Sequence, residues 1–511
     1  MKAFTEPLLS LAGFEEMTKT AEKSSGLISV TGCIDAQKSQ MIYAFGGHRK
    51  NKLIVTFGEQ KAKELYDEYS FFDKEVVYYP SKDVLFYQSD IRGNLLTAER
   101  IRALKAIREK ERVTLVTTFD ALMNTMAPIE KMWENVLTLE QGQLLDLKEI
   151  QAALIRMGYE KEYQVQTMGQ FSVRGGILDV FPLTEENPIR IELWGDEIDT
   201  IRYFDCESQK SIENTDRVSI YPAAELVLSD EEKAGGIEKL KAEAKRVSDK
   251  LRKQMKTEEA HRVTVMADEL TEEWGELSMY AGMDAFLSYF FDERVGLLDY
   301  FNPSDSLIFF DELTRCTEQG KLTETEFSES MKQRLAMGYI LPGQMNGLFT
   351  EKEIVAKLGK YSCIALAALD NKANGLHQLG SYGIHCQSVS PYNNSFELLI
   401  KDLKRYKKNG YRVILLSGSR TRAKRLSEDI TDQGITCFYT ENYDHELSQG
   451  QIMVCYGKVR RGFEYPILKF AVITESDIFG AQQKKKKRHR TYEGEKSTEL
   501  YRFVGWGLCG A

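Results

Sequence analysis

Residues 168–203 read MGQFSVRGGILDVFPLTEENPIRIELWGDEIDTIRY, and their hydrophobic pattern predicts a small antiparallel sheet. Two segments, Phe171–Arg174 and Ile189–Trp194, alternate apolar and polar residues, which is the period of a half-buried strand. The pair Gly175–Gly176 suits a tight hairpin turn, and Gly195–Glu197 supplies another turn. We therefore expect a meander of short strands in this stretch.

The two faces of this expected sheet differ in composition. Successive side chains of a strand point to opposite faces, so Arg174, Arg190 and Trp194 fall together on the face opposite the apolar residues. Arginine and tryptophan are enriched among the residues that dominate protein–protein affinity. The composition leaves two interpretations open. The face binds a protein partner, or it is a solvated face on which Trp194 covers an edge.

The size and charge of the chain limit its architecture and its function class. The 511 residues predict three or four domains, each able to bury its own core. The hydrophobic content of 42% and the charged content of 28% are ordinary for a soluble protein. The net charge of −9 excludes a protein that coats nucleic acid along its whole surface, so any DNA contact has to be local.

No membrane, secretory or metal-site signal is visible in the sequence. No run reaches the roughly 18 apolar residues of a membrane span, and acidic residues lie where a signal peptide would be apolar. The eight cysteines are scattered, with no CxxC pair and no Cys/His cluster. We therefore expect a cytoplasmic protein with no membrane partner, no disulfide framework and no metal site.

The loop that follows the first expected strand resembles a phosphate-binding loop in part. Such a loop needs G-x-x-x-x-G-K-[ST], because glycines let backbone amides surround the phosphates and the lysine meets the outer phosphates. Here the order is GCIDAQKS at 32–39. Gln37 replaces the second glycine, and Asp35 adds negative charge where phosphate would lie. The remaining matches, which we interpret as a degenerate and inactive nucleotide site, are Gly32, Lys38 and Ser39.

A second feature supports the interpretation of a degenerate nucleotide site. The apolar segment Leu307–Phe310 predicts a buried strand that ends in Asp311 and Glu312. A carboxylate at a strand end followed by a glutamate holds magnesium and orients water in P-loop motors. The alternative interpretation is an acidic helix cap.

Alternating strands and helices predict an α/β multidomain protein. We expect a degenerate P-loop-type parallel sheet, an inserted small antiparallel-sheet domain and a separate α/β domain. In the first part the expected strands are Ser24–Thr31, Leu53–Phe57, Val76–Tyr79 and Val113–Thr117, and the expected helices are Gln37–Phe45, Glu59–Phe72 and Leu95–Glu111.

The same reading divides the chain into five parts. Residues 1–130 form the first part of the degenerate α/β domain, and 131–225 form the inserted interaction domain. Residues 226–345 are a helical return segment, which includes a long charged helix over 229–257 with a break at Gly235–Gly236. Residues 346–480 form the third α/β domain, and 481–511 are a basic linker and a tail.

The sheet residues resemble a known interaction domain. FSVRGGILDVFP at 171–182, RIELWGDEI at 190–198 and RYFD at 202–205 are similar to the domain shared by the excinuclease B subunit (UvrB) and the bacterial transcription-repair coupling factor (Mfd). In that family the sheet docks on the excinuclease A subunit (UvrA) through two arginines and an aromatic residue. By motif position, the resemblance implies that the UvrA-binding residues are Arg174, Arg190 and Trp194.

Other segments resemble the coupling factor in particular. They are YYPSKDVLFY at 78–87, TTFDALM at 117–123, GKVRRGF at 457–463 and FAVITESDIFG at 470–480. The resemblance implies a module with the layout of the excinuclease B subunit but without ATPase activity. The full-length family is an ATP-dependent DNA translocase that displaces stalled RNA polymerase. Its motor uses ATP and magnesium, and no intact phosphate loop occurs here, so no cofactor is expected in this chain.

The family's other partners belong to segments that we do not find in this sequence. RNA polymerase and double-stranded DNA are bound through missing C-terminal domains. The DNA-gripping hairpin of the excinuclease B subunit has no counterpart at Tyr87–Leu96, which is too short and too polar.

The last part of the sequence changes in character. KKKKRHR at 484–490 is a solvated basic linker or a weak phosphate contact. Residues 501–511 match nothing recognisable. Our hypothesis is a reading frame that is truncated or shifted near Lys496, which resequencing of the gene tests.

The third α/β domain contains a strand, a loop at 417–419 and a helix. Gly418, Arg420 and Arg422 form an anion cradle at the helix N-terminus, or the loop is an ordinary connection.

Two functions of different classes follow. The first is a non-catalytic recruitment module of transcription-coupled nucleotide excision repair that binds the A subunit. The alternative is an ATP-dependent excinuclease B-like DNA repair enzyme or helicase, which requires a nucleotide at Lys38 and Asp311.

Overall fold

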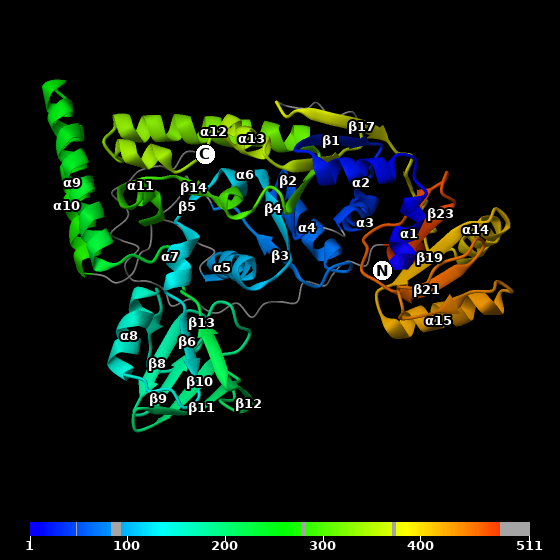
Figure 1. Ribbon diagram of the computed structural model, residues 1–511, viewed down its shortest axis with the longest axis horizontal. Coiled ribbons are helices and arrows are strands. Elements are labelled where there is room, and N and C mark those ends of the chain that lie inside the picture. The colour runs from blue at the N-terminus through cyan, green and yellow to red at the C-terminus, as the bar shows by residue number, and fades with distance from the viewer. Residues whose placement is uncertain (47–48, 83–93, 277–282, 370–374, 481–511) are drawn as a thin grey trace.

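A seven-stranded parallel sheet lies at the centre of the computed structural model (Figure 1). The structure describes residues 1–46, 49–82, 94–276, 283–369 and 375–480. The strand order is β17-β1-β16-β15-β2-β4-β3. The strands are β1 (Gly26–Thr31), β2 (Asn51–Thr56), β3 (Val76–Tyr79), β4 (Val113–Thr118), β15 (Ser306–Asp311), β16 (Ser362–Leu366) and β17 (Gln378–Gly383).

Helices cover both faces of this sheet, which is why its central strands read as nearly continuous apolar runs. Every residue of β4 and β15 is buried. The helices of this unit are α1 (Lys2–Leu9), α2 (Phe14–Lys23), α3 (Asp35–Phe45), α4 (Glu59–Tyr69), α5 (Asn94–Glu109), α6 (Phe119–Met123), α12 (Leu313–Ala336) and α13 (Glu351–Leu358). The alternation of strands and helices expected for the first part is confirmed, with element ends within three residues of the expected ones.

The inserted sheet has six strands in the order β12-β11-β10-β9-β8-β7, and its neighbours are antiparallel except for the parallel pair β7 and β8. Its apolar face packs on α8 (Leu147–Arg156) and a two-stranded ribbon of β6 (Leu137–Glu140) and β13 (Arg217–Ile220). The antiparallel meander expected here is confirmed. The strands are β7 (Glu160–Lys161), β8 (Gln170–Arg174), β9 (Ile177–Val180), β10 (Ile189–Trp194), β11 (Glu197–Phe204) and β12 (Ser211–Asn214).

A helical segment follows the insertion. Its two long helices, α9 (Asp230–Lys253) and α10 (Thr257–Glu276), pack side by side at one edge of the molecule (Figure 1). The break expected at Gly235–Gly236 is wrong, because α9 continues through both glycines. A Cβ at Gly236 would lie 2.2 Å from the Phe290 ring, so the glycine permits close packing against α11 (Leu287–Phe290).

Short elements connect this segment to the first sheet. They are β5 (Thr125–Met126), α7 (Ile129–Glu134), η2 (Met283–Phe286), β14 (Val295–Gly296), η3 (Leu297–Tyr300) and η4 (Pro342–Asn346).

The third unit has its own mixed sheet, in the order β18-β22-β23-β19-β21-β20. The central strand β19 is parallel to both β21 and β23, whereas β22 runs antiparallel to β23. The elements are β18 (Gln387–Ser388), α14 (Phe396–Lys408), β19 (Arg412–Ser417), α15 (Arg420–Asp432), β20 (Phe438–Tyr439), β21 (Ile452–Tyr456), β22 (Phe463–Tyr465), β23 (Phe470–Thr474) and α16 (Glu475–Phe479).

The boundary expected at residue 346 needs a correction. The strands β16 and β17 pair with β1 and β15 of the first sheet, so residues up to Gly383 belong to that sheet. The strand partners of β16 lie far away in the sequence, and local patterns carry no information about such pairing.

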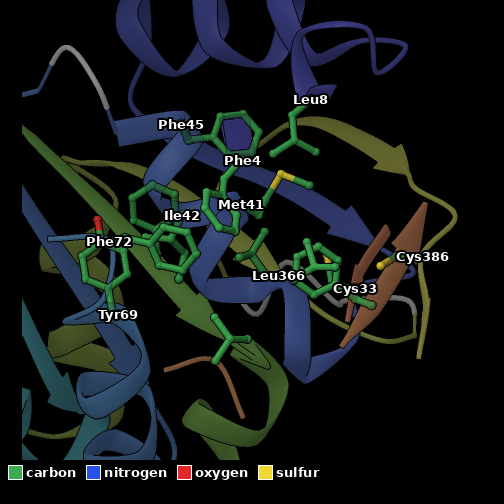
Figure 2. Close-up of a cluster of buried hydrophobic side chains, with 14 of the residues drawn as sticks. Phe4, Leu8, Cys33, Met41, Ile42, Phe45, Tyr69, Phe72, Leu366 and Cys386 are labelled. Atoms are coloured by element: carbon green, nitrogen blue, oxygen red, sulfur yellow. The ribbon is translucent and has the colours of Figure 1, made fainter. Parts of the chain in front are cut away.

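The separate third sheet is confirmed, but its apolar face shares one hydrophobic core with the first unit. Leu416 and Tyr465 belong to the same buried cluster as Phe4 and Phe72. Figure 2 shows part of this cluster, in which Phe4 of α1 lies together with Met41, Ile42 and Phe72. The third unit is therefore packed on one side of the first sheet, and the inserted sheet lies on another (Figure 1).

Within the part of the chain that the structure describes, each helix is too short or too polar to span a bilayer. The segments at 484–490 and 501–511, the position Lys496 and most of Tyr87–Leu96 lie outside the described residues.

Candidate functional site

The register of the inserted sheet brings its polar residues together on one face. Asp179 of β9 lies directly opposite Ser172 of β8 on one side and Arg190 of β10 on the other. Arg174 lies two residues after Ser172 on β8, so it is on the same face of the sheet, and it pairs with Ile177 of β9. The strands therefore carry Arg174 and Arg190 to the face that the alternation predicts, opposite the buried Ile189 and its apolar neighbours.

The two arginines share one buried carboxylate. Arg190 donates from Nε to Asp179 Oδ1 at 2.7 Å and from Nη2 to Asp179 Oδ2 at 2.8 Å, and Arg174 Nη2 donates to the same Oδ2 at 2.9 Å. The Asp179 side chain is only 2% exposed. A buried carboxylate is stable only when cations and hydrogen bonds compensate its lost hydration, so Asp179 fixes the positions of both guanidinium groups.

The two arginines differ in how much they offer to a partner. The Arg190 side chain is 13% exposed, donates also to Gln209 Oε1 at 2.9 Å, and lies 4.4 Å above the Phe204 ring. Its hydrogen bond to Asp179 holds its pKa above the usual range. The Arg174 side chain is 37% exposed. Arg190 therefore serves mainly inside the sheet, and Arg174 keeps donors free for an incoming group.

Trp194 is the most accessible of the three predicted site residues. It ends β10 and is 84% exposed, immediately before Gly195, whose φ of +66° allows the turn into β11. A large aromatic side chain in water on a folded surface is a common anchor of protein interfaces. Arg174 and Trp194 are thus the two predicted residues that a partner can reach directly.

Two residues in or next to this face were not predicted from the sequence. Asp179 was recognised only as part of a motif, although a single carboxylate within the apolar run ILDVF is itself a signal of a buried ion pair. Tyr163 is 83% exposed, and its carbonyl oxygen accepts a hydrogen bond of 2.7 Å from Ser172 Oγ. No local pattern places Tyr163 beside β8, because the contact depends on the path of the loop before that strand.

The backbone of the loop at 32–39 is already engaged. Cys33 N donates to Ala367 O at 2.9 Å and Gly32 N donates to Ala368 O at 3.3 Å. Gly32 has φ +78°, and a Cβ there would lie 2.1 Å from Ile384 O. Amides that would surround a phosphate in a phosphate-binding loop are thus bonded to the segment after β16.

Lys38 is enclosed by carboxylates. Its Nζ lies 2.6 Å from Asp311 Oδ1, 2.9 Å from Glu312 Oε1 and 3.2 Å from Asp35 Oδ1, and its side chain is 1% exposed. Burial alone would lower the pKa of Lys38, but Asp311 and Glu312 outweigh it and raise that pKa. The structure therefore brings the predicted Lys38, Asp311 and Glu312 together as a closed ionic cluster.

Gln37 and Ser39 of the loop are also buried. Gln37 Oε1 accepts a hydrogen bond of 3.2 Å from the Tyr465 hydroxyl of the third unit, and Ser39 is fully buried. Asp311 also accepts from Thr56 Oγ1 at 3.1 Å. In this arrangement the residues do not fit a triphosphate with magnesium, because Lys38, the Ser39 hydroxyl and Asp311 are all buried inside the protein.

The loop at 417–419 holds an anion that the chain itself supplies. Gly418 N and Ser417 Oγ donate to Glu475 Oε2 at 2.6 and 2.9 Å, and Arg422 pairs with the same carboxylate. Arg420 instead pairs with Glu441 at 3.3 Å. The start of α15 is thus stabilised by Glu475, which follows β23.

Comparison with known proteins agrees with the sheet geometry. Residues 137–226 match the UvrB interaction domain. The chain is 28% identical to the transcription-repair-coupling factor of Bacillus subtilis over 450 residues, which are 88% of this chain and 38% of that protein. The chain is a homologue of the transcription-repair coupling factors.

Two further coupling factors give the same result. The protein from Staphylococcus haemolyticus is 26% identical over 491 residues, which are 94% of this chain and 40% of the relative. The protein from Staphylococcus aureus (strain MRSA252) is 26% identical over 508 residues, which are 97% of this chain and 42% of the relative. This coupling-factor homologue therefore spans about two fifths of the length of its relatives.

Proposed function

We propose that this chain is a recruitment module of transcription-coupled nucleotide excision repair that binds the excinuclease A subunit (UvrA). The observation that carries the proposal is the exposure of both Trp194 and Arg174, 84% and 37%, on a sheet that matches the UvrB interaction domain. Arg174 and Trp194 contact the partner, and Arg190 positions Arg174 through their shared Asp179.

The side chains on this face indicate which groups the complementary surface of UvrA should present. Arg174 uses one Nη2 donor on Asp179, which leaves the rest of its planar guanidinium group for a carboxylate of the partner. The Trp194 indole needs an apolar pocket, because burying such a ring in a protein interface is strongly favourable. We therefore expect an acidic residue next to an apolar depression on UvrA.

Calorimetric titration of UvrA with the full chain tests this proposal. Arg174→Ala and Trp194→Ala each weaken binding at least tenfold, equivalent to about 1.4 kcal/mol or more. The matched control is Arg217→Ala, because Arg217 is 66% exposed on the neighbouring β13. Unchanged affinity in both site variants, with intact folding, rejects the assignment.

We also propose that the module works without a nucleotide at the loop of Lys38. The closed ionic cluster around Lys38 supports this part. The alternative function is an ATP-dependent excinuclease B-like enzyme or helicase. Calorimetry with magnesium and ATP separates the two functions, since micromolar binding that disappears in Lys38→Ala supports the enzyme and rejects the recruitment module as stated.

The resemblance implies that RNA polymerase and double-stranded DNA are bound by other domains of the full-length family. The UvrA-binding face that we propose involves neither of them.

A further inference from the structure

The tip of the α9–α10 hairpin is a positioned, exposed feature that the UvrA proposal does not use. Figure 1 shows the two helices side by side at the edge of the molecule, with one end projecting beyond α12. The helices hold each other through Leu251, Ala260 and Val263. Near the tip, Gly338 contacts α10 so closely that a Cβ there would lie 2.6 Å from Glu259 O. Arg262 of α10 lies 5.0 Å above the Tyr339 ring.

The tip concentrates positive charge on a chain whose net charge is −9. Residues 245–256 contain six lysines and arginines and one acidic residue, whereas residues 268–276 at the other end of α10 contain five acidic residues and no basic one. Because the two ends of the hairpin have opposite charge, an anionic partner is attracted to the tip and repelled from the base.

Three of these cations form a stripe along the solvent side of α9. Arg246, Lys250 and Lys253 are spaced i, i+4 and i+7, so they lie on one face with about 5–6 Å between neighbouring Cβ atoms. All three are exposed. In the described part of the chain, none of the three takes part in an ion pair, whereas Lys131 and Lys239 pair with Glu232 and Asp292.

The geometry points to the phosphate backbone of double-stranded nucleic acid as the partner of this tip. The duplex presents about one negative charge per 1.7 Å of axis, so a row of lysine and arginine side chains meets successive phosphates without needing a fitted pocket. A protein partner would instead require apolar area around the charges, and within residues 245–256 the large apolar side chain that is exposed is Met255. The contact positions the duplex and does not read its sequence.

Fluorescence anisotropy of a labelled 30-base-pair duplex with the full chain tests the inference. The variant combines Arg246→Gln, Lys250→Gln and Lys253→Gln. We expect its affinity to fall at least tenfold at low salt. The slope of log K against log salt concentration should decrease by about one for each lost phosphate contact.

The matched control removes the same charge from another exposed helix face. It combines Lys401→Gln, Lys404→Gln and Lys408→Gln on α14, which are all exposed. We expect the control to change duplex affinity less than twofold. Both triple variants retain the far-ultraviolet circular dichroism of the parent chain, because exposed lysines and arginines contribute little to folding.

Three results would overturn the inference. They are an absence of duplex binding by the parent chain, an equal loss of affinity in the two triple variants, and equally tight binding of the tip to polyglutamate. The inference does not depend on the proposed function, and UvrA affinity measured on the same tip variant is expected to stay unchanged.

Discussion

The face of the inserted sheet and the loop around Lys38 contain the same types of charged side chain, but they differ in how accessible those side chains are. Each combines basic side chains with a buried carboxylate, Asp179 in the sheet and Asp311 at the loop. In the sheet, the carboxylate holds two arginines, of which Arg174 remains partly accessible. At the loop, three carboxylates surround one lysine that is 1% exposed. A charged motif therefore indicates binding only when its partners inside the protein leave part of it free.

The largest effect in this comparison is expected at the loop. Lys38→Ala leaves Asp311 buried without its main cation, and removing one member of a buried pair costs about 3–5 kcal/mol. Urea unfolding measures the change in the free energy of unfolding. Lys61→Ala is the control, since Lys61 pairs with Asp35, which is 70% exposed, and it should cost less than about 1 kcal/mol. Equal stability of the two variants would show that the loop is not closed around Lys38.

The second prediction separates the two arginines of the sheet. Arg190→Ala removes two hydrogen bonds to Asp179 and the contact with Phe204, so it should destabilise the chain by about 3 kcal/mol. Arg174→Ala removes one bond from a half-exposed side chain and should cost less than about 1 kcal/mol. Thermal unfolding of both variants provides the comparison. A larger cost for Arg174→Ala would reverse the roles that we assign to them.

The third prediction concerns pH at the side of the first sheet that faces the third unit. Burial raises the pKa of Glu68 to about 8. Between its ordinary value of 4.5 and about 8, the folded state keeps a proton that the unfolded state releases. Stability from this group is therefore lost as the pH rises through that interval.

Glu68→Gln removes this titration and should be more stable than the parent chain by at least about 2 kcal/mol at pH 8, with little difference near pH 4.5. Urea unfolding between pH 4.5 and 9 measures the difference. Glu64→Gln is the control, because Glu64 is 31% exposed and pairs with Arg460. Parallel pH profiles for Glu68→Gln and the parent chain would contradict the prediction.

The smallest effect on stability is expected for Trp194→Ala, although we expect this substitution to weaken UvrA binding strongly. Trp194→Ala should change the free energy of unfolding by less than about 0.5 kcal/mol, because the side chain is 84% exposed and leaves no cavity. Thermal unfolding checks this value on the same sample that is used for UvrA titration. A loss above 2 kcal/mol would mean that Trp194 packs within the sheet rather than facing a partner.

The local periodicity of the sequence predicted the features that depend on residues close together in the chain, namely strands and their faces. The alternation in 171–174 and 189–194 correctly sorted the faces of β8 and β10, and the apolar run before Asp311 correctly predicted a buried strand. Pairing between distant segments was not accessible in the same way. The sequence showed neither that β16 and β17 complete the first sheet nor that Tyr465 contacts Gln37.

Burial was the second quantity that the sequence could not supply. Alternation placed Arg174, Arg190 and Trp194 on one face, but the exposed fractions of 37%, 13% and 84% depend on Asp179, Gln209 and the turn at Gly195. The glycine pair in α9 was interpreted as a break, because its function in packing against Phe290 becomes visible only in three dimensions.

Hydrogen–deuterium exchange of the full chain, alone, with excess UvrA and with magnesium and ATP, tests both halves of the comparison in one measurement. We expect UvrA to slow exchange in peptides covering 168–203, above all at the turn amides near Gly175 and Gly195. We expect ATP to leave exchange in peptides covering 26–45 unchanged. Protection of 26–45 by ATP, or unchanged exchange across 168–203 with UvrA, would contradict the roles that we assign to the sheet face and to the loop.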